Sequence, residues 1–240
     1  MSEVIEIRSG VELPSIREEI SFVTADGLTL VGELAMPVGK TPTATLVTFH
    51  PLPTHGGFMD SHIYRKAANR LPALANIAVL RFNTRGTSSP RGTSQGAFGE
   101  GIAERFDVQA AIDFALSRNL PNLWMVGWSF GTELTLKYGW NQPITGAILL
   151  SPPLHRTSDE ELDRWVGNSR KLLILVPELD DYLKPAEAKV RFAKIDHAQV
   201  IGVDGAKHLW VGEAATKRVL DEVVRVVNPS AYPLPETIEI

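Results

Sequence analysis

A serine between two glycines is the first feature of the sequence that could do chemistry. Residues 127–131 read Gly-Trp-Ser-Phe-Gly, and Ser129 stands at their centre, directly after the short apolar run 123–128. A sharp turn from a strand into a helix would lift the Ser129 hydroxyl above the edge of a sheet. A Cβ at either flanking glycine would clash in so tight a turn. Ser129 is therefore a candidate nucleophile for attack on an acyl carbonyl.

A serine nucleophile needs a base, and the base needs a carboxylate to orient it. In the strand–turn–helix setting of this motif, the base comes last in the chain. The histidines after Ser129 are His155, His197 and His208. His155 precedes the best carboxylate, and His197 lies at the start of a strand, on the opposite edge of the sheet. His208 follows the strand 198–203, where we expect it to open the last helix, so we assign it as the base.

The carboxylate is expected after the strand 172–176, where Asp180 and Asp181 stand next to each other. Two charged carboxylates beside one imidazole would be unfavourable, so one of them is expected to face solvent. The residues alone leave the choice between these two open. Asp204 is a weaker candidate, because it lies in the loop of the base and suits a turn cap with Gly205.

A second backbone donor is needed to hold the negative oxygen of a tetrahedral intermediate. The loop 50–57 reads His-Pro-Leu-Pro-Thr-His-Gly-Gly. The two prolines have no N–H, so Leu52 is the donor between them. We assign Leu52 together with Phe130, whose N–H opens the helix after the serine. His55 is able to face the pocket, whereas His50 is expected to be structural, hydrogen-bonded beneath the loop.

Apolar strands and amphipathic helices alternate along the chain and must position these residues. This alternation predicts a mostly parallel sheet covered by helices on both faces, with ligands at the carboxyl ends of the strands. Asp26-Gly27 predicts a hairpin turn between the first two strands. The expected strands are 20–24, 28–35, 44–50, 77–82, 123–128, 144–150, 172–176 and 198–203, and the expected helices are 62–71 (ended by Pro72), 102–117, 130–138, 158–166, 185–195 and 207–227.

Together these residues resemble the α/β-hydrolase superfamily over nearly the whole chain. The loop 50–57 and the Gly-x-Ser129-Phe-Gly turn are most similar to small bacterial serine hydrolases near the dienelactone-hydrolase and acylaminoacyl-peptidase branches. The Arg-Gly turn of the family is matched by residues 83–86, and the acid in its next helix by Asp107. The resemblance implies an α/β-hydrolase fold with a mostly parallel eight-stranded sheet and helices on both faces.

In the family the catalytic acid commonly lies three residues after a glycine and a few residues before a proline. This spacing favours Asp180 over Asp181. Here Pro177 stands at the glycine position. Dienelactone hydrolases proper use a cysteine nucleophile, and this chain has no cysteine, so that activity is not implied.

A cap domain is not expected, because the gap between the strands 144–150 and 172–176 is too short for one. The site should be open, roofed by the loop 87–98, by Phe58 and Met59, and by the stretch 154–165. The residues expected to contact substrate are His55, Phe58, Trp128 and Leu154.

The predicted function is a carboxylesterase-like serine hydrolase that cleaves a small acyl ester or thioester through a Ser129-His208-Asp180 triad and an acyl-enzyme. A serine exopeptidase or an acyltransferase on the same triad stays open, as does a non-catalytic member that only binds a ligand. No cofactor is required. A metal site from His50, His55 and His62 would match no standard ligand spacing, so none is expected.

Composition points to an ordinary globular chain. Its 240 residues suit one domain, 1–240, with an N-terminal extension 1–18 and a C-terminal tail 228–240 that we expect to be extended or poorly ordered. A net charge of −4 without basic runs argues against nucleic acid. No apolar run approaches the roughly 20 residues of a membrane span, and the acidic start lacks a signal-peptide core, so we expect a cytoplasmic protein. The apolar tail could pack on its own domain or on a second copy, which leaves a homo-oligomer open.

Overall fold

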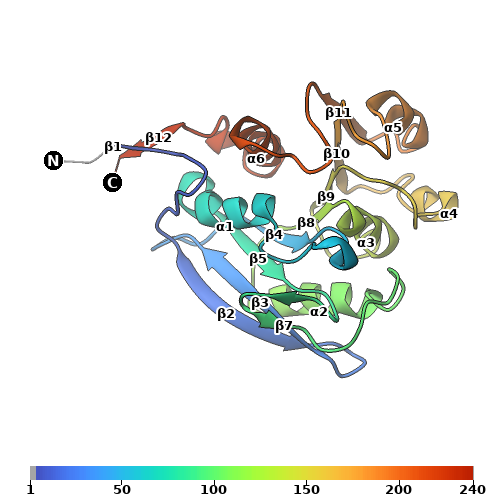
Figure 1. Cartoon of the computed structure of the whole chain (residues 1–240), viewed down its shortest axis with the longest axis horizontal. Helices are drawn as coiled ribbons and strands as arrows, with labels where there is room; N and C mark the ends of the chain where they lie inside the picture. The colour runs from blue at the N-terminus through green and yellow to red at the C-terminus, as the bar shows by residue number, and fades with distance from the viewer. Residues whose placement is uncertain (1–3, 240) are drawn as a thin grey trace.

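The computed structural model of the protein describes residues 4–239, and an eight-stranded sheet forms its centre (Figure 1). The strands of this sheet are β2 Ile16–Val23, β3 Thr29–Met36, β4 Ala44–Phe49, β5 Ile77–Phe82, β8 Leu123–Trp128, β9 Gly146–Leu150, β10 Lys171–Pro177 and β11 Ala198–Val203. Their spatial order is β11-β10-β9-β8-β4-β5-β3-β2. Strand β3 pairs antiparallel with both β2 and β5, and all the pairs from β5 to β11 are parallel. The predicted mostly parallel eight-stranded sheet is confirmed.

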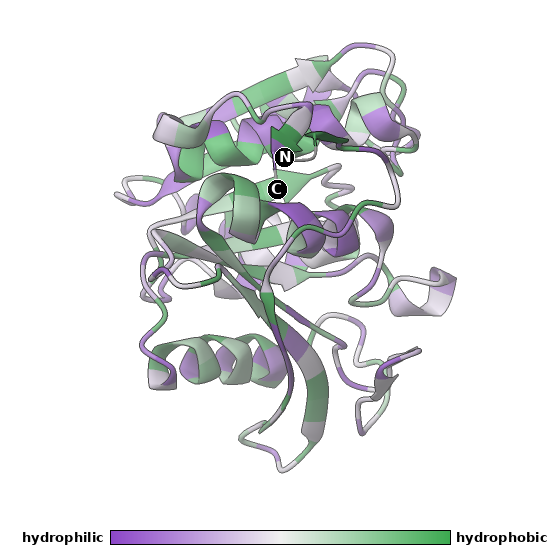
Figure 2. Ribbon diagram, turned by 90° about the vertical axis from the view of Figure 1, so that its left-hand side faces the viewer, coloured by the Kyte–Doolittle hydropathy of each residue, from purple (hydrophilic) through white to green (hydrophobic). Residues whose placement is uncertain are grey.

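Helices cover both faces of this sheet, as predicted. They are α1 His62–Ala75, α2 Arg105–Ser117, α3 Phe130–Tyr138, α4 Asp159–Asp163, α5 Pro185–Arg191 and α6 Glu213–Val227. Successive strand residues point to opposite faces, so Leu46 and Val47 belong to different hydrophobic cores. The core around Leu46 contains α1 and α6, and the core around Val47 contains α2 to α5. Hydrophilic and hydrophobic residues are interleaved along the helices, as expected for helices with one buried face (Figure 2).

Three strands have the bounds that the sequence predicted. Every residue of β5 and of β8 is buried, and each strand appears in the sequence as an apolar run, interrupted only by Arg81 of β5 and bounded by polar residues. Both strands, and also β11, begin and end at the predicted residues. The hairpin of β2 and β3 turns at Gly27, whose positive φ of 87° is the reason for a glycine there.

Helix α1 continues through Pro72, although we expected the proline to end it. A proline has no N–H to donate to the carbonyl four residues earlier, which here belongs to Ala68. The Nη1 atom of Arg17, from β2, donates to the Ala68 carbonyl at 2.9 Å in its place. A side chain distant in the sequence thus supplies the missing donor. The helix ends instead at Ala75, and Asn76 after it adopts the left-handed conformation (φ 52°).

The last helix begins at Glu213 and not at Lys207. Residues 207–212 form a loop, which Gly212 closes with a φ of 103°. His208 therefore lies in a loop and does not open a helix. The expected helix from Ile102 likewise starts later, at Arg105.

The two ends of the described chain pair with each other, at the left of Figure 1. Strand β1, Val4–Glu6, runs antiparallel to β12, Thr237–Glu239. Of the two alternatives expected for the tail, extended or poorly ordered, the described part is ordered and ends in the extended strand β12. The Leu234 side chain is buried in the core of α1 and α6, and its N–H donates to Asp221 Oδ1 at 2.9 Å. The tail packs on its own domain.

Between β9 and β10 the chain forms only the five-residue helix α4, which confirms the expected absence of a cap at this position. Across residues 4–239, none of the helices has the length and hydrophobicity that a membrane crossing needs.

Candidate active site

Ser129 occupies the turn between β8 and α3. Its backbone has φ 52° and ψ −117°, a strained combination for a residue with a side chain. The Ser129 N–H donates to the carbonyl of Leu150 on the neighbouring strand at 2.9 Å, which anchors the turn. The sharp turn expected from the sequence is present.

The two flanking glycines are required by close backbone contacts. A Cβ on Gly127 would lie 2.3 Å from the Gly131 carbonyl oxygen, and one on Gly131 would lie 1.9 Å from the Phe49 carbonyl oxygen. The first contact is the clash expected inside the turn. The second was not foreseen, because it arises where α3 crosses the end of β4.

The structure brings Ser129, His208 and Asp180 together. The Ser129 Oγ lies 2.9 Å from His208 Nε2, and His208 Nδ1 lies 2.9 Å from Asp180 Oδ2. The three side chains come from loops at the carboxyl ends of β8, β11 and β10, which are distant in the sequence but share one edge of the sheet. In this arrangement the hydroxyl donates to Nε2 and the opposite ring nitrogen donates to the carboxylate.

Asp180 is held as a carboxylate. Burial raises its pKa, but the hydrogen bond from His208 and the backbone N–H groups of Tyr182 and Leu183 outweigh burial, so that the net pKa is lowered. The neighbouring Asp181 is exposed. Of the two acids that the sequence left open, the structure places Asp180 on the imidazole.

Backbone contacts fix the loop of Asp180 against the loop of His208. The N–H of Glu178 donates to the Val203 carbonyl, and that of Leu179 to the Ala206 carbonyl, both at 2.9 Å. These bonds continue the β10–β11 ladder past the ends of the strands. Pro177 fits this turn because only its carbonyl is used there, accepting from the Asp180 N–H at 3.2 Å.

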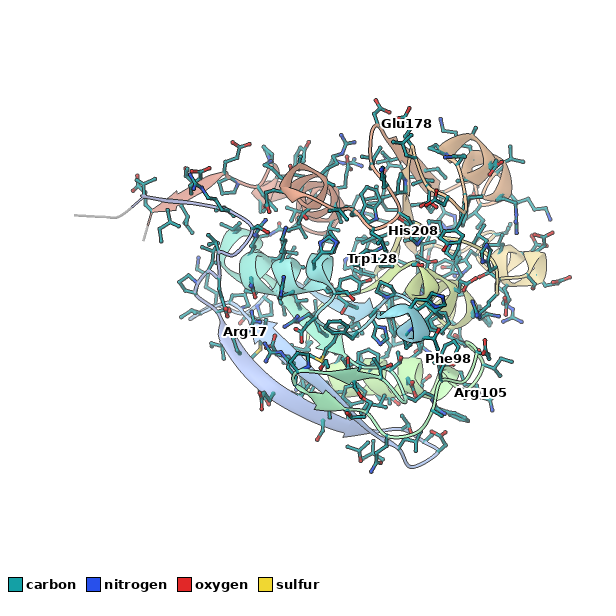
Figure 3. All side chains as sticks on the ribbon, in the orientation of Figure 1. Arg17, Phe98, Arg105, Trp128, Glu178 and His208 are labelled. Atoms are coloured by element: carbon teal, nitrogen blue, oxygen red, sulfur yellow. The ribbon has the colours of Figure 1, made fainter. Side chains whose placement is uncertain are left out.

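Trp128 does not contact the open site, which corrects the expectation that it touches substrate. The indole is buried, and its Nε1 donates to the His208 carbonyl at 3.2 Å (Figure 3). The Ser151 hydroxyl donates to the same carbonyl at 3.0 Å. These two donors position the His208 backbone. The sequence alone could not predict either hydrogen bond, because both depend on where the loop of residues 207–212 lies in the fold.

Replacing Trp128 by phenylalanine should lower kcat/KM roughly fivefold. One neutral hydrogen bond to the His208 carbonyl is lost, which corresponds to about 1 kcal/mol of positioning. Steady-state ester hydrolysis measures the effect. Trp124→Phe is the matched control, since Trp124 is equally buried in β8 but makes no contact with His208. Equal losses in the two variants would contradict the positioning role.

The two expected oxyanion donors, Leu52 and Phe130, line the same cavity as Ser129. Phe130 is the first residue of α3, where an N–H has no partner within the helix. The Leu52 carbonyl accepts from the N–H groups of His55 and Gly57, both at 3.0 Å, which folds the loop back on itself. Within residues 4–239 neither the Leu52 N–H nor the Phe130 N–H donates to a protein acceptor, so both remain available to a ligand.

His50 is buried beneath this loop, as expected for a structural residue. Its Nδ1 donates to the Pro51 carbonyl at 2.7 Å, and its Nε2 accepts from the Thr84 N–H at 3.1 Å. These two bonds require the neutral ring. Burial lowers the pKa of His50 to about 4, against the smaller opposing effect of the Pro51 carbonyl.

Acidification should therefore destabilise the fold through His50. Between pH 6.5 and 4 the unfolded chain binds this proton and the folded chain does not, so the free energy of unfolding rises with pH in this window. The loss between pH 7 and pH 4.5 is about 2–3 kcal/mol. Urea unfolding at both pH values should show a smaller pH dependence for His50→Gln than for the wild type. An unchanged pH dependence would refute the assignment.

The other histidines are distributed rather than clustered. His62 Nε2 bonds the Leu209 carbonyl at 2.7 Å, and His197 pairs with Asp196 away from the site. Among residues 4–239 no three side chains from His, Cys, Asp and Glu are arranged to bind a metal ion.

The chain is similar to known proteins more clearly in structure than in sequence. No family model matches the chain. An uncharacterized protein of Rickettsia prowazekii is 33% identical over 113 residues, which cover 45% of this chain and 45% of that protein. A serine hydrolase without a lid from Xanthomonas campestris superposes with a TM-score of 0.72 at 21% identity, over 93% of this chain and 99% of its own. The chain has the α/β-hydrolase fold.

Two further solved structures are similar to this chain. A serine hydrolase homologue from Coxiella burnetii has a TM-score of 0.72 at 22% identity, over 87% of this chain and 96% of its own. An esterase of Pyrococcus furiosus has a TM-score of 0.69 at 15% identity, over 90% of this chain and 91% of its own. At these identities the similarity establishes the fold, and activity must be argued from the site.

A cavity of about 350 Å³ opens over Ser129 in this α/β-hydrolase fold. Of the expected substrate contacts, His55 lines the cavity, whereas Phe58, Trp128 and Leu154 do not. Leu154 instead packs in the hydrophobic core. The cavity is lined by Pro51, Leu52, His55, Ser129, Phe130, Glu133, Pro153, His155, Arg156, Tyr182, His208 and Leu209.

The roof of the cavity agrees with the expected one only in part. His155 and Arg156, from the expected stretch 154–165, line the cavity, whereas Phe58, Met59 and the loop 87–98 do not. The loop 87–98 is held against β3, where the Gln95 N–H donates to the Thr29 carbonyl at 2.9 Å. Tyr182 forms part of the roof instead, with its ring 4.7 Å from the His208 ring and 5.2 Å from the His155 ring. Tyr182 follows the acid by two residues, so its place in the sequence could have signalled this position.

Proposed function

We propose that the protein is a serine hydrolase that cleaves a small acyl ester or thioester through a covalent acyl-enzyme. The observation that carries the proposal is the hydrogen-bonded chain from Ser129 Oγ through His208 to Asp180, with both distances at 2.9 Å. Nucleophile, base and orienting acid are recognised by this geometry. The strained backbone at Ser129 adds support, because such strain is common at catalytic positions.

The proposed reaction has two halves. His208 removes the Ser129 proton as Oγ attacks the acyl carbonyl, and the N–H groups of Leu52 and Phe130 stabilise the resulting oxyanion. The bond to the leaving group then breaks, and His208 returns the proton to the departing oxygen or sulfur. In the second half a water loses its proton to His208 and attacks the acyl-enzyme. The bond between Ser129 Oγ and the acyl carbon then breaks, Oγ takes the proton back from His208, and the acid is released.

The cavity favours small substrates. Its volume of about 350 Å³ is at the lower end of ligand pockets, and no cap domain stands over β9 and β10 to enclose a long chain. The solved relatives described as a serine hydrolase without a lid and as an esterase are consistent with this choice of substrate.

A fluorophosphonate probe tests the proposal directly. We expect the wild-type protein to be labelled covalently at Ser129, as read by intact mass and peptide mapping, and Ser129→Ala to remain unlabelled. A panel of p-nitrophenyl esters from acetate to decanoate then measures the preferred acyl length. A protein that binds ligands without catalysis would neither react with the probe nor hydrolyse any ester, and that result would overturn the proposal.

A further inference from the structure

Glu133 is a buried carboxylate that the proposed reaction does not use. It lies four residues after Ser129 on α3 and lines the same cavity. Its side chain is fully buried. The Oε1 atom accepts a hydrogen bond from the Arg156 N–H, but Oε2 has no hydrogen-bond partner among the described residues. A buried polar atom without a partner is unfavourable, so Oε2 requires an explanation.

Arg156 stands beside this unpartnered oxygen. Its Nη1 is 3.8 Å from Glu133 Oε2, too far for a hydrogen bond, and its Nη2 pairs with the exposed Glu100 at 3.2 Å. The guanidinium also lies near the faces of Phe98 and Phe130, 5.9 and 5.8 Å from their ring centroids. Within residues 4–239 the Nε and Nη1 atoms of Arg156 donate to no acceptor. The cavity therefore offers an acceptor and donors next to each other.

The two opposite charges disfavour a charged ligand group at this point. An ammonium group that approaches Glu133 Oε2 would meet the guanidinium, and a carboxylate that approaches Arg156 Nη1 would meet Glu133. Burial raises the pKa of Glu133, while Arg156, His155 and Lys137 partly offset the increase. A neutral hydroxyl satisfies both groups, since it donates to Oε2 and accepts from Nη1.

We propose that Glu133 and Arg156 form a subsite for a neutral hydroxyl group on the acyl chain of the substrate. The inference rests on the proposed esterase function and narrows it to hydroxyacyl esters. Glu133 lies in the first turn of α3, four residues after Ser129, and both residues line the same cavity. The hydroxyl that this subsite would bind is therefore a few bonds from the ester carbonyl, and we place it on the third acyl carbon for the test.

Matched p-nitrophenyl esters test this subsite on the wild-type protein. The substrates are 3-hydroxybutyrate, 3-methoxybutyrate and butyrate, which share one leaving group. We expect kcat/KM for the hydroxy ester to exceed that of the other two by about 10- to 100-fold, the range for a hydrogen bond to a charged group. The methoxy ester is the sharper comparison, because it keeps the oxygen but has no proton to donate to Oε2.

Glu133→Gln supplies the second test. The glutamine carbonyl can still accept from the Arg156 N–H, which leaves an amide NH₂ in the place of Oε2. We expect the ratio of kcat/KM between the hydroxy and methoxy esters to fall at least about tenfold, because the NH₂ donates to either oxygen. Glu161→Gln is the matched control, since Glu161 pairs with Lys137 of the same helix and does not line the cavity. We expect its ratio to match that of the wild type.

The outcomes separate the subsite from the esterase itself. If the wild type hydrolyses all three esters at similar rates, or if Glu133→Gln lowers all three equally, the hydroxyl subsite is wrong and the esterase stands. If the wild type hydrolyses none of the three esters and does not react with the fluorophosphonate probe, the proposed serine hydrolase function itself is wrong. Should Glu133→Gln not fold, the wild-type comparison of hydroxy and methoxy esters still decides the question.

Discussion

Ser129→Ala should lower kcat/KM for ester hydrolysis by at least about a thousandfold. The alanine removes the only atom proposed to bond the acyl group, while the N–H groups of Leu52 and Phe130 and the cavity remain. Residual activity above the uncatalysed rate is expected from those groups. Hydrolysis of a short p-nitrophenyl ester, with the enzyme at high concentration, measures the loss.

The loss of kcat/KM in Ser129→Ala should not add to the loss that follows from removing the base, His208. His208 and Ser129 act as one hydrogen-bonded unit at 2.9 Å, so the double variant with both residues changed to alanine should be about as slow as Ser129→Ala alone. Ser88→Ala is the control, because Ser88 is exposed in the small hairpin of β6, Ser88–Ser89, and β7, Gly92–Thr93, and does not line the cavity. Full activity of Ser129→Ala would rule out the proposed mechanism.

Asp180→Asn should reduce kcat by about 10³- to 10⁴-fold, whereas Asp181→Asn should change it less than about threefold. The Asp180 carboxylate accepts from His208 Nδ1 and so selects the tautomer whose Nε2 is free to take the Ser129 proton. An amide in its place can present an N–H to the ring and stabilise the wrong tautomer. Asp181 is exposed and does not line the cavity.

These two neighbouring variants are controls for each other, since each removes one negative charge from the same loop. Circular dichroism and thermal unfolding should show both proteins folded. Fluorophosphonate labelling should slow for Asp180→Asn and stay near the wild-type rate for Asp181→Asn. A larger kinetic loss in Asp181→Asn than in Asp180→Asn would mean that the acid is misassigned.

Much of this molecule could be predicted from local sequence. The strands β5, β8 and β11 are short, mostly apolar runs, and their bounds were predicted to the residue. The turn at Ser129 is local in part, because Gly127 is required by a contact with Gly131, whereas Gly131 is required by a contact with Phe49 of β4. The chain order of nucleophile, acid and base then restricted the candidates to a few loops.

The errors of prediction arise where a contact spans a long stretch of sequence. Pro72 was expected to end its helix. Arg17 instead donates to the carbonyl of Ala68, which lies 51 residues further along the chain. Trp128 was expected to touch substrate, but its indole bonds the carbonyl of His208, 80 residues later. Short-range patterns carry no information about which distant group will be nearby.

By itself the sequence determined the order of strands and helices, the sharp turn at Ser129 and the loops that could carry an acid and a base. It could do so because hydrophobic periodicity and backbone sterics act over a few residues. Only the tertiary structure decided between Asp180 and Asp181, moved Trp128 from the pocket to a supporting role, and placed Glu133 and Arg156 in the cavity beside Ser129. Those outcomes depend on how the parallel strands align their carboxyl ends, and packing across the whole sheet sets that alignment.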